Sequence, residues 1–555
     1  MRLASMRLAS PRLVAALALV GLVHSSRPAS ADSYPRQPGV DAVHYVFRVT
    51  LGDESDEIRG ETTAEFRFAR DGVAEVVLDL ATAANGKGMT VAEVTTGGKA
   101  AKYTHEKSQL RIELDPPAKA GERRTFTVKY RGVPAGGLWI GLNKYKERAF
   151  FSHNWPDKAR QWLPVIDHPH DKATSEFVVT APAKYQVVAS GLLQEEADLG
   201  DGTRRTHWKQ SVPVTTWMTA LGVGQFSVRH SGPVRGVPLQ TWVFRQDRDR
   251  GLATFEAPAR KAVEFFSDRV GPYPYEKLAS IQVAGMQASG MEMASAIFYH
   301  EGTVRGLPAS SLVAHEIAHQ WFGDSVTPDD WDEVWLSEGF ATYFALLYSE
   351  HFDGRDAFVR GLKQSRDGIF RTERAGEKKG QRLTVVHDMM AHRRSDVPNG
   401  LVYTKGSWTL HMLRGQVGTD AFWAGIRDYY QTYRDKTTTT DDLRRVMEEH
   451  SGQKLDWFFK QWLLRSSSPV VEGGWKYNPE TRKVEIELAQ TQPGDPYRLP
   501  IEVAVTTDAN RPPRVVKVEM TKGKQTFEID SAAAPTAVAL DPNTWLLLQA
   551  TFTKR

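Results

Sequence analysis

The order of hydrophobic and polar positions changes twice along the chain, and these changes predict three regions of different structure. From residue 32 to about 228, apolar residues alternate with polar ones at 45–51 and 62–68, which is typical of half-buried strands. Similar strand candidates occur at 76–80, 125–130 and 177–180. Turn sequences such as Asn85-Gly86 separate them. Residues 32–228 are therefore predicted to form an N-terminal β-sheet domain.

Between about residues 229 and 466 the apolar residues follow the period of an α-helix. The first such segment, 251–270, ends at Gly271-Pro272, and the segment 439–450 begins with Thr and Asp residues suited to helix capping. A short strand is expected at 280–284. The helices are predicted at 251–270, 308–322, 333–350, 355–370, 405–416, 419–434, 439–450 and 455–465. This region is predicted to be a mainly helical domain.

Alternation returns after Ser466-Ser467-Ser468-Pro469, in the segments 483–489, 500–506 and 515–520. Residues 467–555 are therefore predicted to form a small C-terminal β-sandwich. The expected fold class is multidomain α+β, with a β domain, a mainly helical domain and a second β domain in that order.

The first 31 residues have the pattern of a secretory signal peptide. Arg2, Arg7 and Arg12 precede the apolar run 13–23, and residues 29–31 read Ala-Ser-Ala, a typical cleavage site. The apolar run is shorter than the roughly 20 residues that cross a bilayer, although an uncleaved anchor is the alternative. We expect a periplasmic or secreted protein without stable membrane insertion after cleavage.

Charge and cysteine content narrow the classes of function. The formal net charge is +4, but the leader carries four arginines and no acidic residue. Removing these four from the 71 basic residues leaves 67, which equals the number of acidic residues. The mature chain is therefore formally neutral and contains no nucleic-acid-binding motif, so no nucleic-acid partner is expected. The absence of cysteine excludes disulfides and cysteine-ligated metals.

The segment His315-Glu316-Ile317-Ala318-His319 has the form H-E-x-x-H. On a helix the two histidines share one face and can bind a single metal ion, with Glu316 beside them. A surface helix with two solvated histidines is the alternative. Glu338 follows in the next predicted helix, and an antiparallel helix pair would bring it to the metal as a third ligand. Two His and one Glu with one open position is the pattern of a catalytic zinc site, so one Zn²⁺ per chain is expected.

Several segments resemble the gluzincin zinc aminopeptidases, meaning aminopeptidase N and its relatives. Residues 315–344, HEIAHQWFGDSVTPDDWDEVWLSEGFATYF, resemble the core of that family almost throughout. Residues 289–293, SGMEM, are similar to its G-A-M-E-N exopeptidase motif, and residues 402–406, VYTKG, to its Y-x-K-G segment. Residues 160–172, RQWLPVIDHPHDK, resemble a stretch of its N-terminal domain. The likeness covers roughly residues 40–470.

The resemblance implies a fold and a set of metal-site roles. The expected architecture is a saddle-like N-terminal β domain at 32–228 and a thermolysin-like catalytic domain at 229–466. His315, His319 and Glu338 would bind zinc. Glu316 would be the general base that activates the attacking water.

The resemblance also implies residues that contact a peptide substrate. Tyr403 would donate a hydrogen bond to the developing oxyanion, and Glu292 would hold the free α-ammonium group. Gly290 and Met291 would lie along the extended substrate. Taken alone, Tyr403 is more often a packed aromatic and Glu292 more often a solvated strand residue; the matched motifs and their chain order favour the functional roles.

Two positions depart from the family pattern at the amine-binding end of the cleft. Met293 replaces the Asn of the exopeptidase motif, and Trp155 stands where the family usually has a second polar or acidic amine-binding residue. These changes are either harmless or mark a first subsite that is more apolar and less dependent on a free amine.

The function expected from the sequence is that of an exported zinc aminopeptidase acting on peptides. One alternative is a zinc peptidase of the same fold that accepts modified or blocked peptides. Another is a non-catalytic peptide-binding protein. The complete set of His315, Glu316, His319, Glu338 and Tyr403 argues against the second alternative.

Overall fold

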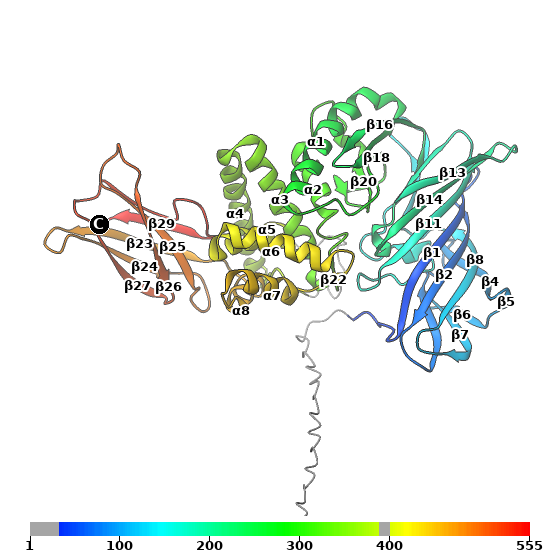
Figure 1. Cartoon of the computed structure of the whole chain (residues 1–555), viewed down its shortest axis with the longest axis horizontal. Helices are drawn as coiled ribbons and strands as arrows, with labels where there is room; N and C mark the ends of the chain where they lie inside the picture. The colour runs from blue at the N-terminus through cyan, green and yellow to red at the C-terminus, as the bar shows by residue number, and fades with distance from the viewer. Residues whose placement is uncertain (1–32, 388–399) are drawn as a thin grey trace, which may run out of the picture.

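A computed structural model of the chain describes residues 33–387 and 400–555, so the predicted signal peptide at 1–31 lies outside the described residues. Strands fill the first part of the chain, helices the middle and strands again the last part (Figure 1). The predicted α+β fold class is therefore confirmed.

The N-terminal part is built on one eight-stranded sheet. Its neighbouring strands are antiparallel except for β1 and β11, which run parallel. Alternate residues of β2, such as Ala64, Phe66 and Phe68, are fully buried, as the sequence pattern predicted. In spatial order the strands are β13 (Leu192–Asp198), β14 (Thr203–Val214), β11 (Ala173–Pro182), β1 (Val40–Thr50), β2 (Ile58–Phe68), β8 (Arg123–Val133), β4 (Gly88–Thr96) and β5 (Lys99–Ala100).

Two smaller sheets complete this part of the molecule. One consists of β3 (Val73–Asp79), β7 (Gln109–Ala118) and β6 (Tyr103–Glu106). The other consists of β12 (Gln186–Ala189), β15 (Leu221–Gly224), β10 (Arg148–Ser152) and β9 (Leu138–Leu142). The next strand along the chain, β16 (Phe226–Val234), belongs to a separate five-stranded sheet.

This five-stranded sheet forms one wall of the central region. Its order is β16 (Phe226–Val234), β17 (Val237–Phe244), β18 (Leu278–Val283), β20 (Ala296–His300) and β19 (Gly290–Met291). The short strand β19 is antiparallel to β20 and lies at the edge of the sheet. An edge strand has unpaired backbone groups on one side, to which an extended peptide can pair.

Eight helices of at least two turns make up the rest of the central region as far as the structure describes it. The start of α7 has the predicted cap, a capping box between Thr439 and Asp442. α2 ends at His319, three residues earlier than predicted, because the chain turns there and the N–H of Asp324 bonds to the His319 carbonyl. The helices are α1 (Arg248–Arg269), α2 (Ser310–His319), α3 (Trp335–Asp353), α4 (Arg355–Lys378), α5 (Leu401–Val417), α6 (Thr419–Tyr433), α7 (Thr440–Ser451) and α8 (Asp456–Leu463).

The C-terminal part consists of two sheets (Figure 1), and the loop between its last two strands packs against α5. One holds β27 (Lys524–Asp530), β24 (Lys483–Gln490), β23 (Val470–Asn478) and β29 (Gln549–Lys554). The other holds β26 (Arg514–Met520), β25 (Leu499–Thr506) and β28 (Ala537–Leu540).

His411 of α5 is the centre of that packing. Its ring stacks on Trp545 with centroids 4.9 Å apart, and Nε2 donates to the Thr544 carbonyl at 2.8 Å. Its Nδ1 lies 3.3 Å from the Tyr343 hydroxyl, which donates to it. Both ring nitrogens of a neutral imidazole are thus used, and burial lowers the pKa of His411 to about 3.

Two glycines allow α3 and α5 to approach closely. A Cβ on Gly339 would lie 2.9 Å from the backbone carbon of Gly406, and one on Gly406 would lie 3.1 Å from Cα of Gly339. Any side chain at either position would separate the helices. The contact is next to Glu338 on α3 and three residues after Tyr403 on α5, so it sets the distance between the two predicted site residues.

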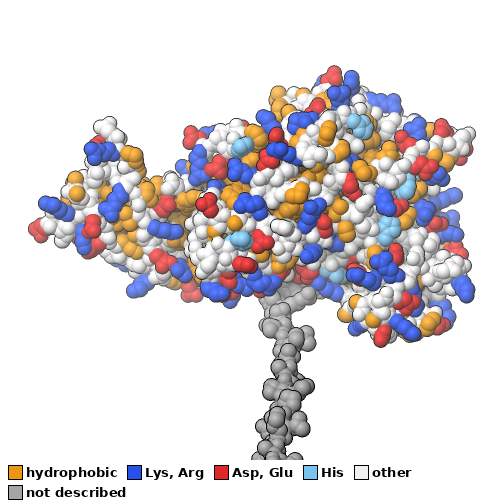
Figure 2. Space-filling view, in the orientation of Figure 1, with side chains coloured by type: hydrophobic (Ala, Val, Ile, Leu, Met, Phe, Trp, Pro, Cys, Tyr) orange, Lys and Arg blue, Asp and Glu red, His pale blue; other side chains and the backbone are white. Residues whose placement is uncertain are grey.

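The surface carries mixed charge. On the face shown in Figure 2, basic and acidic side chains are interspersed over all three parts of the molecule. Among the described residues, no helix combines the length and apolar character needed to cross a bilayer.

Acidification is expected to weaken the protein through His411. In the unfolded chain histidine titrates near pH 6.5, whereas the folded imidazole has a pKa of about 3. The stabilisation by neutral His411 is therefore complete above pH 6.5 and declines as the pH falls below it, by about 1.4 kcal/mol per pH unit at most. Calorimetric melting at pH 7 and pH 5 should show a smaller acid-induced drop in Tm for His411→Gln than for the wild type. An equal drop would rule out His411 as the cause.

Gly339→Ala is expected to lower the free energy of unfolding by about 1–3 kcal/mol, because the added methyl overlaps the α5 backbone. The matched control is Gly368→Ala on α4, where the new Cβ meets only the end of the Arg371 side chain at 3.8 Å. That control should gain about 0.5–1 kcal/mol from helix propensity alone. Urea unfolding of both variants checks the opposite signs, and a stabilised Gly339→Ala would contradict the close helix contact.

Candidate active site

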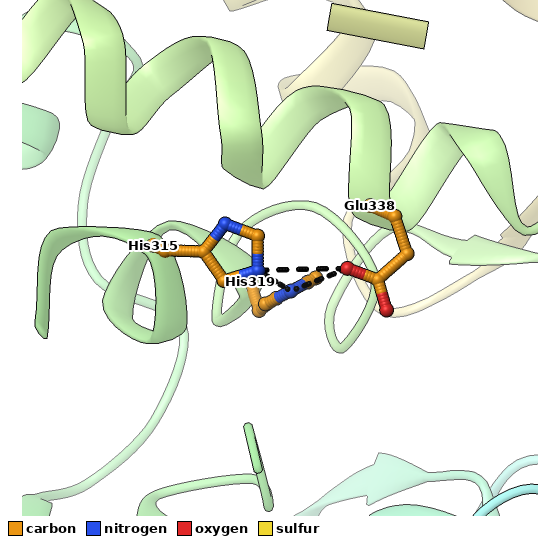
Figure 3. A group of neighbouring side chains, drawn as sticks. All are labelled: His315, His319 and Glu338. Atoms are coloured by element: carbon orange, nitrogen blue, oxygen red, sulfur yellow. Dashed lines mark hydrogen bonds and ion pairs between the residues drawn. The ribbon is translucent and has the colours of Figure 1, made fainter. Parts of the chain in front are cut away.

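His315, His319 and Glu338 converge as predicted (Figure 3). Nε2 of His315 and Nε2 of His319 lie 3.2 Å apart. Oε2 of Glu338 lies 3.5 Å from the first and 3.3 Å from the second. Three donor atoms thus form a nearly equilateral triangle with one open side.

The two helices that carry these residues favour a cation between them. His315 and His319 lie one turn apart at the C-terminal end of α2, where the helix dipole is negative. Glu338 lies in the first turn of α3, where the positive end of that helix dipole stabilises its carboxylate.

The orientation of His319 is fixed by groups that the sequence did not point to. Its Nδ1 lies 3.0 Å from Oγ of Ser337 and 3.3 Å from the Phe322 carbonyl, both possible hydrogen-bond partners. Gly323 permits this packing, because a Cβ there would lie 2.3 Å from the Ser337 hydroxyl. Contacts of this kind hold a metal-binding imidazole in one orientation. Ser337 directly precedes Glu338, and this adjacency was the only available sequence signal.

The site carries a strong negative potential. Burial disfavours the charged form of His319, but Glu292 and Glu338 outweigh it and raise the pKa of His319 to about 10. Burial also opposes ionisation of Glu338, yet the two imidazoles lower the pKa of that carboxyl to about 2. The carboxylates therefore stabilise positive charge between the two helices.

The donor set fits zinc. Ligands at 2.0–2.2 Å from a tetrahedral zinc lie about 3.3–3.6 Å from one another, close to the separations in the triangle. Oε2 of Glu338 is buried and makes no hydrogen bond within the described part of the chain, as expected of an atom reserved for a metal. Two imidazoles and one carboxylate are also ligands that zinc prefers.

A cleft of about 440 Å³ opens beside this cluster. Residues of both the N-terminal part and the central region line it: His153, Trp155, Lys158, Gly285, Met286, Gln287, Ala288, Ser289, Gly290, Met291, Glu292, Leu312, His315, Glu316, His319, Glu338 and Tyr403. All but one of the predicted site residues are in this set.

Glu316 lies against strand β19. A Cβ on Gly290 would lie 2.1 Å from Oε1 of Glu316, so only glycine leaves room for this carboxylate. Burial, and then the charge of Glu292, raises the pKa of Glu316 well above its usual range. The carboxylate therefore accepts a proton readily.

Glu292 is a buried carboxylate with one oxygen left without a hydrogen bond among the described residues. Its side chain is 4% exposed, and Oε1 makes no hydrogen bond among the residues described. Donor atoms of Glu292, Glu316 and His319 all lie within 4.8 Å of one another. A buried carboxylate in this state is suited to bind a cationic group that enters the cleft.

Tyr403 lies next to the metal ligand His315. Its ring centroid is 6.4 Å from that of His315, with an angle of 22° between the planes. Burial, and then the charge of Glu338, raises the pKa of the Tyr403 hydroxyl well above its usual range. The hydroxyl therefore keeps its proton and can donate it in a hydrogen bond.

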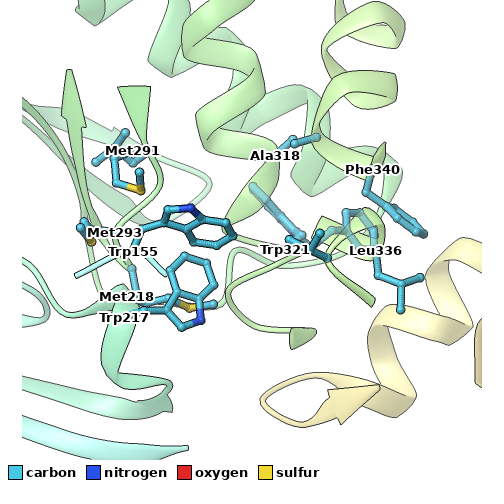
Figure 4. Close-up of a cluster of buried hydrophobic side chains, with 14 of the residues drawn as sticks. Trp155, Trp217, Met218, Met291, Met293, Ala318, Trp321, Leu336 and Phe340 are labelled. Carbon is cyan, nitrogen blue, oxygen red and sulfur yellow. The ribbon is translucent and has the colours of Figure 1, made fainter. Parts of the chain in front are cut away.

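Trp155 lines the cleft, and two other tryptophan rings pack against its ring. Its ring meets that of Trp217 edge-on, with centroids 4.8 Å apart (Figure 4). It meets the ring of Trp331 in the same way, with centroids 4.9 Å apart. Such pairs add stability beyond the area that they bury. The cleft wall at this point is therefore a fixed aromatic surface.

Met293 does not reach the cleft. Its side chain is 0% exposed and belongs to the buried cluster drawn in Figure 4. The chain turns after β19, so Met291 faces the cleft while Met293 points into the core behind it. The prediction that Met293 contacts substrate is not supported by this position.

Comparison with known families gives two matches in chain order. A model described as Peptidase M1 N-terminal domain matches residues 41–218, and one described as Peptidase family M1 domain matches residues 256–462. Together they cover well over half of the chain and include every residue of the metal cluster.

Individual proteins show the same likeness. Glutamyl aminopeptidase of Rattus norvegicus is 27% identical over 428 residues, which are 72% of this chain and 45% of the rat protein. A probable aminopeptidase 2 of Sulfurisphaera tokodaii is 26% identical over 494 residues, which are 84% of this chain and 59% of that protein. The chain thus spans about half the length of these curated relatives.

A solved structure matches over nearly its whole length. The M1 zinc metallopeptidase from Deinococcus radiodurans is 26% identical with a TM-score of 0.65, covering 77% of this chain and 94% of that one. Because the two family models and this structure agree with the metal cluster and the order of domains, the chain belongs to the M1 peptidase family.

Proposed function

We propose that this chain is a zinc aminopeptidase that hydrolyses the first peptide bond of peptides with a free amino terminus. The observation that carries the proposal is the position of Glu292. This buried carboxylate, with one oxygen free of hydrogen bonds in the described part of the chain, shares one cleft with the predicted zinc ligands. Its donor atom lies within 4.8 Å of those of Glu316 and His319.

The short distance between Glu292 and the metal cluster favours removal of single residues from the amino terminus. In a peptide the α-nitrogen lies only about 2.5 Å from the carbonyl carbon of the same residue. An ammonium group held by Glu292 therefore brings the first carbonyl, and no later one, next to Glu316 and the metal cluster. This arrangement favours an exopeptidase over an endopeptidase.

The buried acidic side chains of the cleft support the same substrate. Glu292, Glu316 and Glu338 are buried and contribute three negative charges when ionised, whereas Lys158 at the cleft wall is partly exposed. A zinc dication and one α-ammonium group bring three positive charges. Buried carboxylates are stable only when they are paired, so a substrate with a free amine completes the balance.

His315, His319 and Glu338 would hold the zinc. When bound, zinc supplies Lewis acidity to the scissile carbonyl and to the attacking water. Glu316 accepts a proton from that water on a carboxylate oxygen and delivers it to the nitrogen of the leaving amine. Its raised pKa favours the first of these steps, the uptake of the proton.

The remaining residues orient the substrate. Tyr403 donates its hydroxyl hydrogen to the carbonyl oxygen as negative charge develops there. The edge strand β19, with Gly290 and Met291, pairs with the extended backbone of the peptide. Both interactions place the first peptide bond against Glu316.

Trp155 supports a second candidate, a peptidase of the same fold that accepts modified or blocked peptides. Its ring offers the amine end of the cleft an apolar aromatic wall rather than a second carboxylate. Such a wall tolerates an acyl or alkyl group on the terminal nitrogen. Export to the periplasm or the exterior remains a prediction from the leader sequence.

Glu316→Gln is expected to lower kcat by at least about 1,000-fold, because the amide cannot accept the proton. Zinc content, measured by elemental analysis, should stay at one ion per chain, since Glu316 is not among the proposed ligands. The matched control is Glu333→Gln, a half-buried carboxylate bonded to Thr440 outside the cleft, which should retain most of the activity. Near-normal turnover in Glu316→Gln would refute the proposed mechanism.

A panel of aminoacyl-anilides and their N-acetyl forms distinguishes the two candidates. Acetylation leaves Glu292 without a cationic partner, so kcat/KM should be at least about 100-fold higher for the free amines. Glu292→Gln should reduce that preference. If the acetylated substrates are cut equally well, the proposed aminopeptidase function is refuted. The second candidate, a peptidase that accepts blocked peptides, is then supported.

A further inference from the structure

The side chain of Gln320, directly after His319, is hydrogen-bonded through both atoms of its amide in the core. The residue is 0% exposed. Its Nε2 donates to the Glu292 carbonyl at 3.0 Å and to Oδ2 of Asp324 at 2.7 Å. Its Oε1 accepts from the N–H of Ser295 at 2.8 Å. The Tyr273 hydroxyl lies 3.0 Å from this oxygen and 3.1 Å from the Lys277 carbonyl, and its single hydrogen serves one of the two.

Two of these bonds hold the segment that carries Glu292. Strand β19 ends at Met291 and β20 begins at Ala296, so residues 292–295 form a short connection between the two strands. Its later half has backbone bonds, from the Ala294 N–H to the Met218 carbonyl and from the Ala279 N–H to the Ser295 carbonyl. Gln320 binds the segment at both ends, through the Glu292 carbonyl and the Ser295 N–H. The carboxylate of Glu292 has an oxygen without a hydrogen bond in the described structure, so its backbone must locate it.

The conformation of this segment needs external support. Ser295 has a φ of 62°, in the left-handed region that non-glycine residues rarely adopt. The ammonium group of Lys277 contacts the Ser295 carbonyl at 3.1 Å, and the Gly191 N–H donates to its hydroxyl at 2.7 Å. These contacts fix the segment against the sheet and the N-terminal part. Only Gln320, within the described residues, joins it by side-chain hydrogen bonds to the metal-binding helix.

We infer that Gln320 is a positioning residue that sets the separation between Glu292 and the metal ligand His319. Gln320 is covalently next to His319 and is hydrogen-bonded to the backbone of Glu292. The amide therefore transmits the position of the metal-binding helix to the carboxylate that would hold the substrate amine. This inference rests on the proposed aminopeptidase function and assigns to Gln320 the alignment of the ammonium group relative to the metal.

The test compares two ligands that differ only in the amine. Leucine hydroxamate carries an α-ammonium group and a metal-binding hydroxamate, whereas 4-methylpentanohydroxamate lacks the amine. The dissociation constant of the amine-free compound divided by that of leucine hydroxamate gives an affinity ratio. Measured by titration calorimetry on the zinc-loaded protein, this ratio reports how well Glu292 is aligned. The affinity of the amine-free compound reports the metal site alone.

In Gln320→Met, which keeps the size of the side chain but removes its hydrogen bonds, the ratio should fall by about 10- to 100-fold. Affinity for the amine-free compound should stay within about threefold, because the three metal ligands are unchanged. On aminoacyl-anilides the same variant should lose kcat/KM by a similar factor.

Gln282→Met is the matched control. Gln282 is also 0% exposed and lies in the same region, but its amide binds the Phe244 N–H and Asp247, away from the cleft. It should reproduce the loss of thermal stability without changing the affinity ratio. Tyr273→Phe, which removes the hydroxyl beside Oε1 of Gln320, should fold normally and lower the ratio by a few-fold.

An unchanged ratio in Gln320→Met, together with a lowered Tm, would reduce Gln320 to a buried structural residue and overturn the inference. If Gln320→Met does not fold, an unchanged ratio in Tyr273→Phe overturns it and a lowered ratio supports it. A wild-type protein that does not prefer the amine-containing ligand would instead refute the proposed function, and with it the premise of this inference.

Discussion

The burial of three carboxylates beside two imidazoles is the constraint on which the rest of the structure depends. Charges withdrawn from water are costly unless they are paired, and Glu292 and Glu338 each keep one oxygen without a hydrogen bond in the described structure. The surrounding fold must hold these groups in place before any metal or substrate compensates them. The ends of α2 and α3 contribute their dipoles, and the other contacts around the cleft contribute rigidity.

Rigidity comes from backbone contacts that tolerate no side chain and from hydrogen bonds that cross between regions. Gly339 and Gly406 bring α3 and α5 together, while Gly290 leaves space for Glu316. The ammonium group of Lys172 reaches from the N-terminal part to the turn after α2, where it donates to the Asp324 and Ser325 carbonyls at 3.0 and 2.7 Å. Neither part of the protein could shift without disturbing the turn that follows His319.

The metal cluster and the order of domains could be predicted from the sequence because both rest on local spacing. Two histidines four residues apart must share a helix face, and alternation of apolar residues marks strands wherever it occurs. The end of α2 at His319 was missed because the turn that follows depends on Gly323 packing against Ser337, a tertiary contact. The inward direction of Met293 likewise follows from the turn after β19 rather than from its neighbours in sequence.

The role of Gln320 could not be predicted for a related reason. A glutamine after a helical histidine carries no signal of its own, and its partners at residues 273, 292 and 295 come from segments on either side of β18 in the chain. Only the folded arrangement shows that its amide bonds to the segment that carries Glu292. Local sequence patterns therefore identify the residues proposed to react. The residues that position them, such as Gln320, are identified only from the folded structure.

Helix α5 connects the C-terminal part to the proposed active site. Tyr403 faces the cleft from the first turn of this helix, and His411, about 12 Å further along it, is stacked on Trp545. A Cβ on Gly415 would lie 2.9 Å from the Trp545 ring, so the two surfaces are fitted to each other. The last 90 residues thus rest on the helix that carries a residue of the proposed active site, and a substitution at Trp545 would disturb their fit to that helix.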